Sequence, residues 1–174
     1  MAEITVPLSR KGIADAKKFL LDYKKNVLQQ KLRLFVERLA QEGVETAKAN
    51  ITTFDAIFTG ELLNSIHEES GVSTKNTAIF YVVADSEHAV WVEWGTGQLG
   101  SEAPYPYPFP EGVEWNYNTG KTIFEISPGQ YGWFYPMDDG TWRFTQGMPS
   151  RPFMYETAID LRQRMVQIAK EVFK

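Results

Sequence analysis

The stretch His88-Ala89-Val90-Trp91-Val92-Glu93-Trp94-Gly95-Thr96-Gly97 decides how the rest of the chain is interpreted. Positions 90, 92 and 94 are apolar and would share one face of a strand, because side chains alternate with a period of two residues. The two glycines that follow can adopt positive φ angles, which lets a chain turn sharply. We therefore predict a short strand over 88–94 that ends in a tight turn.

Two further strands are predicted just before this stretch. The first covers Ser65–Ser70, and the second covers Thr77–Ala84. The second strand is apolar on both faces, which is typical of a strand in the centre of a sheet. Short turns join all three segments, so we expect an antiparallel meander.

Helical periodicity is found on both sides of the predicted sheet. Ser9 is a candidate N-cap, and apolar residues recur at steps of three and four over 10–49, which predicts one long bent helix or two consecutive helices. A second apolar stripe over 154–172 predicts a C-terminal helix. Ser150 is the predicted cap of this helix, and Pro152 suits its first turn.

Residues 98–148 form an aromatic and proline-rich insert. Proline alternates with aromatic residues over Pro104–Pro110, which predicts a stiff extended arm because each proline restricts its own φ and the residue before it. Two aromatic segments joined through Asp139-Gly140 predict a β-hairpin at about 132–145. An insert of this length in a compact domain is usually functional.

The length fits one domain over residues 1–174. The predicted elements make it α+β, with an antiparallel sheet of about four or more strands packed against a long N-terminal helix and a C-terminal helix. The chain is 43% hydrophobic, has a net charge of −4 and contains no cysteine. The acidic balance argues against a protein that binds nucleic acid over its whole surface. Neither a signal peptide nor a membrane-spanning segment is expected.

Glu93 is the first candidate for chemistry, because a carboxylate between two tryptophans could act as a general acid. No motif places a second carboxylate or base beside it, so we favour an edge or rim glutamate that bonds to the backbone or to an arginine. Gly95-Thr96-Gly97 could suggest a phosphate-binding loop, but the spacing of such loops is missing. We interpret it as a turn.

The remaining polar candidates are isolated. His67 and His88 are the only histidines and lack the spacing of metal ligands, and Ser65 lacks the context of a nucleophile. The lysines of the N-terminal helix form a basic face that is either solvated or a weak contact for phosphate. We predict no catalytic residue, no metal and no cofactor.

Three roles remain open for the aromatic residues of the insert. They could contact a protein partner, form a local core beneath the loop, or stack on sugars as a carbohydrate-binding or adhesion module. The structural and interface candidates are Trp91, Glu93, Trp94, Gly95, Thr96, Gly97, Tyr105, Tyr107, Phe109, Trp133, Tyr135, Trp142, Arg151, Pro152 and Phe153.

Three motifs in order resemble the tail-completion, neck or head–tail joining proteins of long-tailed double-stranded DNA phages. They are Thr59-Gly60-Glu61-Leu62-Leu63-Asn64-Ser65-Ile66, then Trp91–Gly97, then Thr145–Met154 leading into the final helix. The resemblance covers about residues 30–174. The first 25 residues and the arm over 98–130 are less typical of the family.

The resemblance implies a non-enzymatic virion protein, made in the host bacterial cytoplasm. Family members assemble as rings, for which six copies are expected, between the head connector and the tail. The implied partners are other copies of the chain and the neighbouring head-connector and tail proteins. DNA would pass through the channel without specific binding, and no membrane is involved.

Overall fold

The computed structural model describes residues 5–56, 60–74, 77–137 and 139–174. Thr59, the first residue of the first motif, lies outside them. The chain forms two compact units. Unit 1 consists of Met1–Thr46, His67–Val83 and Ala158–Lys174, and unit 2 consists of Ala47–Ile66 and Ala84–Thr157. The single domain expected from the length stays a prediction.

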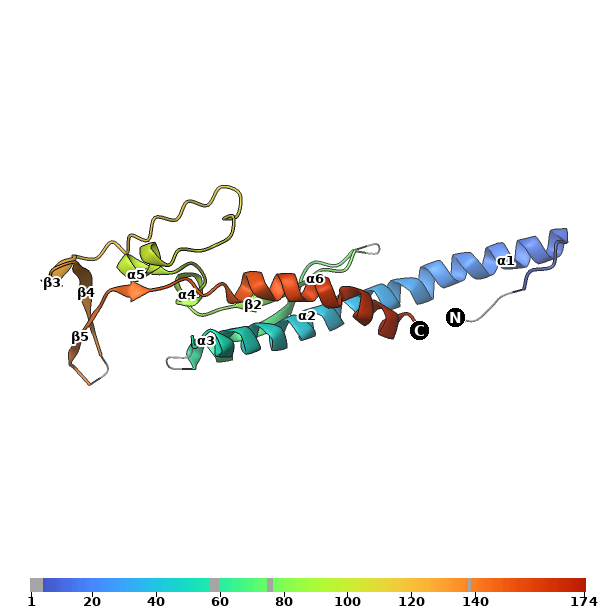
Figure 1. Cartoon of the computed structure of the whole chain (residues 1–174). Coiled ribbons are helices and arrows are strands. Elements are labelled where there is room, and N and C mark those ends of the chain that lie inside the picture. Colours follow the sequence, from blue (N-terminus) through green and yellow to red (C-terminus); the bar gives the residue numbers. More distant parts are fainter. Residues whose placement is uncertain (1–4, 57–59, 75–76, 138) are drawn as a thin grey trace. The chain divides into compact units, whose positions relative to one another are not determined.

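The N-terminal part of the chain is helical from residue 10 to residue 53 (Figure 1). Helix α1 (Arg10–Asp22) continues through the π-helical segment η1 (Tyr23–Leu28) into α2 (Gln29–Thr53). The predicted cap is confirmed, because the Ser9 hydroxyl accepts a hydrogen bond of 3.0 Å from the Gly12 N–H. The helix ends four residues later than the periodicity predicted.

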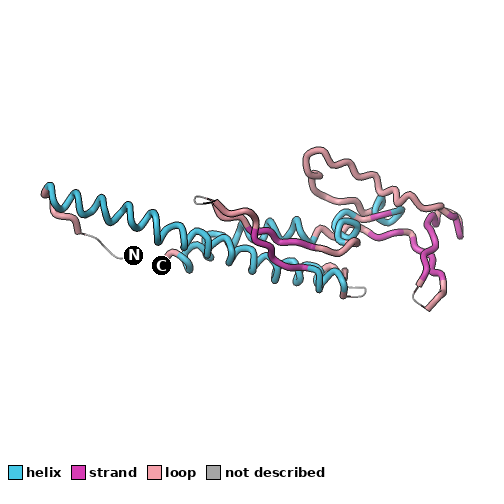
Figure 2. Tube along the Cα trace, turned by 180° about the vertical axis from the view of Figure 1, so that it is seen from behind, coloured by secondary structure: helices cyan, strands magenta, loops and turns pink. Residues whose placement is uncertain are grey.

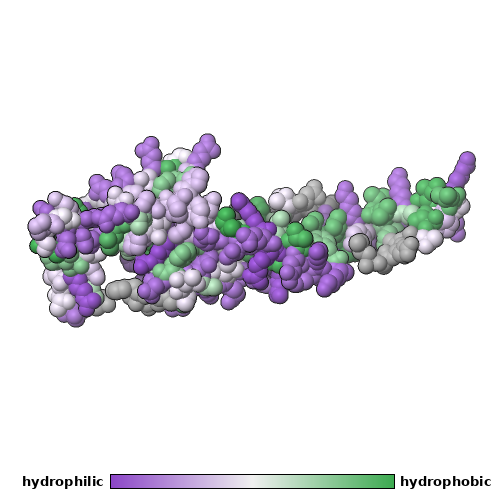
Figure 3. All heavy atoms as spheres, viewed as in Figure 1, coloured by the Kyte–Doolittle hydropathy of each residue, from purple (hydrophilic) through white to green (hydrophobic). Residues whose placement is uncertain are grey.

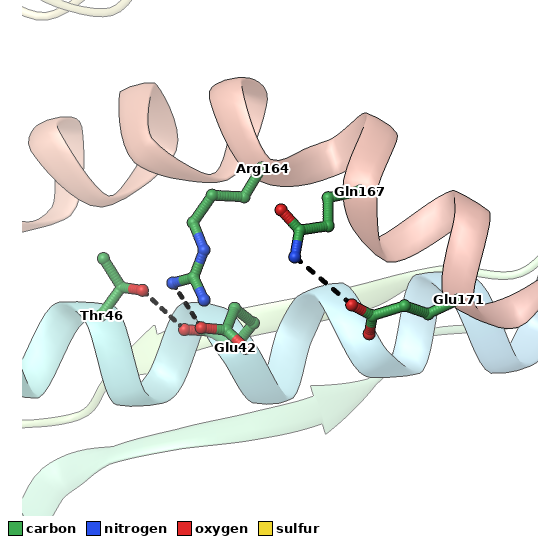
Figure 4. Close-up of polar contacts among 5 residues, drawn as sticks. All are labelled: Glu42, Thr46, Arg164, Gln167 and Glu171. Atoms are coloured by element: carbon green, nitrogen blue, oxygen red, sulfur yellow. Dashed lines mark hydrogen bonds and ion pairs between the residues drawn. The ribbon is translucent and has the colours of Figure 1, made fainter.

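Within unit 1, the C-terminal helix α6 (Phe153–Val172) from residue 158 onward lies beside the part of α2 that ends at Thr46 (Figure 4). The Arg164 guanidinium pairs with the Glu42 carboxylate across these helices. At Gly43 the helix comes close to its neighbours: a Cβ atom there would lie 2.7 Å from Val82 Cγ2 and 3.1 Å from Leu161 Cδ1. Glycine therefore permits a close approach that a larger residue would prevent.

The strands form two separate antiparallel sheets (Figure 2). In the first, β1 (Ile66–Ser70) pairs with β2 (Phe80–Ala84). In the second, the order is β3 (Phe124–Ser127), β4 (Gln130–Pro136) and β5 (Trp142–Thr145). The mixed fold class and the hairpin at 132–145 are confirmed. The predicted central position of Thr77–Ala84 is wrong, because β2 pairs with β1 alone among the described strands.

The predicted strand over 88–94 is also wrong, and with it the three-stranded meander. These residues form helix α4 (Ala89–Trp94), with hydrogen bonds from Val92 N–H to the His88 carbonyl and from Gly95 N–H to the Trp91 carbonyl. Val92 and Glu93 are consecutive and both buried. A strand would turn consecutive residues to opposite faces, whereas adjacent positions on a helix can share a broad buried face.

Three short elements complete the chain. Helix α3 (Glu61–Ser65) precedes β1, and α5 (Gly97–Glu102) follows α4. The last strand, β6 (Gly147–Met148), precedes α6. Between α5 and β3 the described chain is extended without regular structure, as the alternating prolines predicted. Among the described residues, no helix combines the length and apolarity needed to cross a bilayer.

Candidate functional site

The second and third motifs meet in what we call the α4–α6 junction, formed by residues 92–97 and 147–155 in unit 2. At its centre the Glu93 carboxylate accepts two backbone hydrogen bonds from the first turn of α6. Met154 N–H donates to Oε2 at 2.8 Å, and Tyr155 N–H donates to Oε1 at 3.1 Å. The first N–H groups of a helix have no partner within the helix, so Glu93 serves as its cap from 60 residues away.

Ser150, which the sequence predicted as the cap of α6, has another role. Its hydroxyl donates a 2.7 Å hydrogen bond to the Glu93 backbone carbonyl. Arg151 N–H donates to the Val92 carbonyl at 2.9 Å. The segment before α6 is therefore hydrogen-bonded to the end of α4. The group that caps α6 is the Glu93 carboxylate, which is a stronger acceptor than the Ser150 hydroxyl.

The electrostatics of Glu93 reflect its position. The residue is 8% exposed. Burial raises the pKa of Glu93, and the hydrogen bonds from the Met154 and Tyr155 backbones lower it by a smaller amount. Burial, followed by the nearby Glu93 charge, raises the Tyr105 pKa to about 12. Both Glu93 oxygens accept hydrogen bonds from the backbone of α6, as predicted. The predicted edge or rim position of Glu93 is wrong, because the residue is buried.

The glycines of Gly95-Thr96-Gly97 make room for the opposite backbone. Thr96 forms an antiparallel bridge with Met148, and Gly97 forms one with Gly147. Gly95 has φ 81° and ψ 163°, a region that only glycine adopts readily. A Cβ atom on it would lie 2.7 Å from Ser150 N. The turn packs against the backbone of residues 147–150, which agrees with a structural role and not with a phosphate-binding loop.

The proline-rich arm folds over the junction and forms the aromatic cluster: Trp94, Tyr105, Tyr107, Phe109, Trp115 and Tyr155. Ring centroids lie 5.0 Å apart for Trp94–Trp115, 5.5 Å for Trp94–Phe109 and 3.8 Å for the stacked pair Tyr107–Tyr155. Trp115 Nε1–H also donates to the Gly95 carbonyl at 2.9 Å. Of the three roles left open for the arm aromatics, this geometry supports the local core.

Gln98 joins α5 to the second sheet, and nothing in the sequence singled it out. Its Oε1 accepts from Tyr131 N–H and Gln146 Nε2, both at 2.8 Å. Its Nε2 donates to Glu102 Oε1 and to the Gly129 carbonyl at 2.8 and 2.9 Å. These four bonds use the full capacity of a side-chain amide. Gln98 therefore fixes the β3–β4 turn to α5.

The predicted aromatic residues of the hairpin lie on both faces of the second sheet. Trp133 packs at Gly97, where an added Cβ would lie 2.7 Å from its ring. Tyr135 is half-buried, and Trp142 is 65% exposed. Phe134 pairs with Phe144 across β4 and β5, with ring centroids 5.4 Å apart. The hairpin thus presents exposed aromatic surface in addition to the rings it buries.

The other predicted residues fall into two groups. Pro152 and Phe153 are buried, and Asn50 Nδ2 of α2 donates to the Phe153 carbonyl and to Thr157 Oγ1. Trp91 is 43% exposed beside His88 and takes no part in the α4–α6 junction. Sequence reasoning missed Trp115 and Tyr155, whose only signal was their aromatic character near the arm and the third motif.

Among the described residues, no group of three or more His, Cys, Asp or Glu side chains is arranged to hold a metal ion. The chain was also compared with known proteins. No protein-family model, curated protein or solved structure matches it.

Proposed function

We propose that this protein is a structural subunit of a ring in the neck of a long-tailed phage, where it completes the tail or joins it to the head. The observation that carries the proposal is the α4–α6 junction. Two of the three motifs behind the phage resemblance hydrogen-bond to each other there. In the junction, Glu93 Oε1, Glu93 Oε2 and the Ser150 hydroxyl all hold backbone groups.

The first motif contacts the segment that precedes α4. Asp85 N–H donates to the Ser65 carbonyl at 3.5 Å, and the Ser86 hydroxyl donates to Glu61 Oε1 at 3.4 Å. The described part of the motif, Gly60–Ile66, therefore supports the start of the same unit. The pattern that produced the resemblance is a set of structural contacts, which suits a protein whose task is assembly.

The test uses a phage that encodes the protein and a disruption of its gene. We expect unjoined heads and tails in electron micrographs, and restoration of joined particles when the intact gene is supplied. Mass spectrometry of purified wild-type particles should detect the protein, with about six copies in each neck. Normal infectious particles formed without the protein would overturn the proposal.

Exposed tryptophan favours a second candidate, a carbohydrate-binding or adhesion module. Trp142 is 65% exposed, as a residue that stacks on a sugar must be. A glycan array would detect such binding, and Trp142→Ala should abolish it. Trp115→Ala, which alters the aromatic cluster instead, is the control and should leave the binding intact. Absence of binding to any glycan removes this candidate.

A further inference from the structure

The surface of α1 and η1 is apolar and open to solvent. None of the residues of these two segments is buried. Leu20 is 62% exposed, Leu21 59%, Ile13 56% and Phe19 49%, and Figure 3 shows apolar atoms gathered over this helix. An apolar stripe that stays in water is a mark of an interaction site.

This surface is basic as well as apolar. An open depression of about 440 Å³ lies beside α1 and is lined by apolar residues together with Lys17 and Lys24. Six Lys and Arg residues lie within Arg10–Leu28 against two Asp, which gives this stretch a charge of +4. Lysine stems can pack on apolar surface while their ammonium groups meet an acidic partner.

The two units of the chain carry opposite net charges. Unit 1 has 14 Lys and Arg against 10 Asp and Glu, for +4, while unit 2 has 4 against 12, for −8. Glu87, Glu102, Glu111, Glu114 and Glu125 are exposed among the acids of unit 2. Complementary surfaces of this kind increase the rate and the specificity of association.

Unit 2 also exposes an apolar face, formed by the second sheet. The strand register places Phe124 opposite Gly132, Phe134 opposite Phe144 and Trp142 opposite Pro136. Residues two apart on a strand share a face, so the three Phe rings and Trp142 lie on the same side of the sheet. Phe124 is 47% exposed, Phe134 43% and Trp142 65%. This aromatic sheet face lies in the acidic unit.

We propose that the α1–η1 surface of one copy docks on the acidic unit 2 of a second copy, with its apolar residues against the aromatic sheet face. The contact joins two different surfaces, so each copy keeps one of each free for the next. Repetition of such a contact closes into a ring when the rotation allows. The inference supplies the interface that the proposed ring requires, and it can be tested without a phage.

The available area fits a small, transient contact. The helical stretch 10–28 would be about 28 Å long and about 10 Å wide, so half of its cylinder covers about 450 Å². Counting both partners, about 900 Å² would be buried, which lies at the low end of interface sizes, where transient contacts are found. Two α1 surfaces facing each other would have the same area, but their like charges would repel.

Sedimentation velocity of the full chain, over a concentration series at low and high salt, tests the contact. We expect self-association that weakens at least tenfold in dissociation constant between 0.05 M and 0.5 M salt, because exposed charge pairs are screened. Two paired charge reversals, Lys17→Glu with Lys24→Glu and Glu111→Lys with Glu114→Lys, should each weaken association at least tenfold. Mixed together, the two variants should associate again, because each restores the charge that the other lacks.

The control reverses two exposed charges elsewhere in unit 1, Arg162→Glu with Lys170→Glu, and should retain self-association. Far-UV circular dichroism checks that all variants are folded. A chain that stays monomeric at 0.1 mM and low salt overturns the inference. So does association that strengthens with salt and ignores Glu111 and Glu114, because that behaviour indicates α1 paired with α1.

Two other occupants of the basic surface are tested with a 30-base-pair DNA duplex and with vesicles that contain phosphatidylserine. Binding to either probe through Lys17 and Lys24 by a monomeric chain overturns the inference in favour of that occupant. Failure here is separable from failure of the proposed function. A monomer that still enters phage necks refutes this interface alone, whereas a head-to-tail oligomer absent from particles refutes the phage role alone.

Discussion

Replacement of Gly95 by alanine tests how the α4–α6 junction is built. Gly95 has φ 81° and ψ 163°, and strain in this region costs about 1–3 kcal/mol for a residue with a Cβ atom. The new Cβ would also lie 2.7 Å from Ser150 N and 3.0 Å from the Met148 carbonyl oxygen. Overpacking of this kind costs about 1–3 kcal/mol more, because the backbone on the other side must move.

The expected total is a loss of about 2–6 kcal/mol in the free energy of unfolding. For a chain of this size each kcal/mol lowers the melting temperature by about 2–4 °C, so we expect a decrease of about 4–24 °C. Urea denaturation followed by far-UV circular dichroism measures the free energy. Gly95→Val should destabilise the chain further and impair assembly.

Gly112→Ala is the matched control. Gly112 has the same φ of 81°, but nothing lies within 4 Å of the position its Cβ would take. It should lose only about 1–2 kcal/mol, the steric cost of a left-handed backbone. Equal losses for Gly95→Ala and Gly112→Ala, within about 0.5 kcal/mol, would refute the close backbone approach described for the junction.

Three further predictions concern single side chains. Because burial raises the pKa of Glu93, the folded chain takes up a proton at a higher pH than the unfolded chain does. The wild type should therefore gain stability relative to Glu93→Gln as the pH falls through the raised pKa towards 4.5. Urea midpoints of the two proteins that differ by a constant amount from about pH 7 to about pH 4.5 would contradict this. Gly43→Ala should improve helix propensity by about 1 kcal/mol but crowd Val82 at a cost of about 1–3 kcal/mol. We therefore expect urea unfolding to show a net loss of about 1 kcal/mol in stability, and a gain in stability would contradict the close packing at Gly43. Arg164→Ala removes a partly exposed ion pair, so thermal unfolding should show a loss below about 1 kcal/mol; a loss above about 2 kcal/mol would give the ion pair a larger role.

The helices that were predicted correctly have local signals. Ser9 precedes a regular apolar periodicity, and its hydroxyl caps α1 as the pattern indicated. The hairpin formed by β4 and β5 is predictable for the same reason, since its turn residues and its aromatic strands are adjacent in sequence. Ser150 shows the limit of such signals. It has the chemistry of a cap, but a buried carboxylate from α4 occupies the position next to α6.

Helix α4 was mispredicted because its local signal indicates a strand. Valine and tryptophan favour strands, and positions 90, 92 and 94 alternate as a strand requires. The helical alternative buries Val92 and Glu93 together, which brings the Glu93 carboxylate to α6. That contact joins residues 62 positions apart for Tyr155. No window of local sequence contains both partners, so tertiary contacts override the propensity of the segment.

The cap that Glu93 provides to α6 also affects the order in which unit 2 folds during synthesis. Its partner Met154 is 61 residues further along the chain. At about 5–20 residues per second, a ribosome adds that segment in about 3–12 s. Throughout this interval α4 can form its own turn, but its carboxylate has no helix to cap and remains in water. Completion of unit 2 therefore waits for a segment that is translated much later, and slow release of the nascent chain would prolong the exposure of Val92 and Trp94.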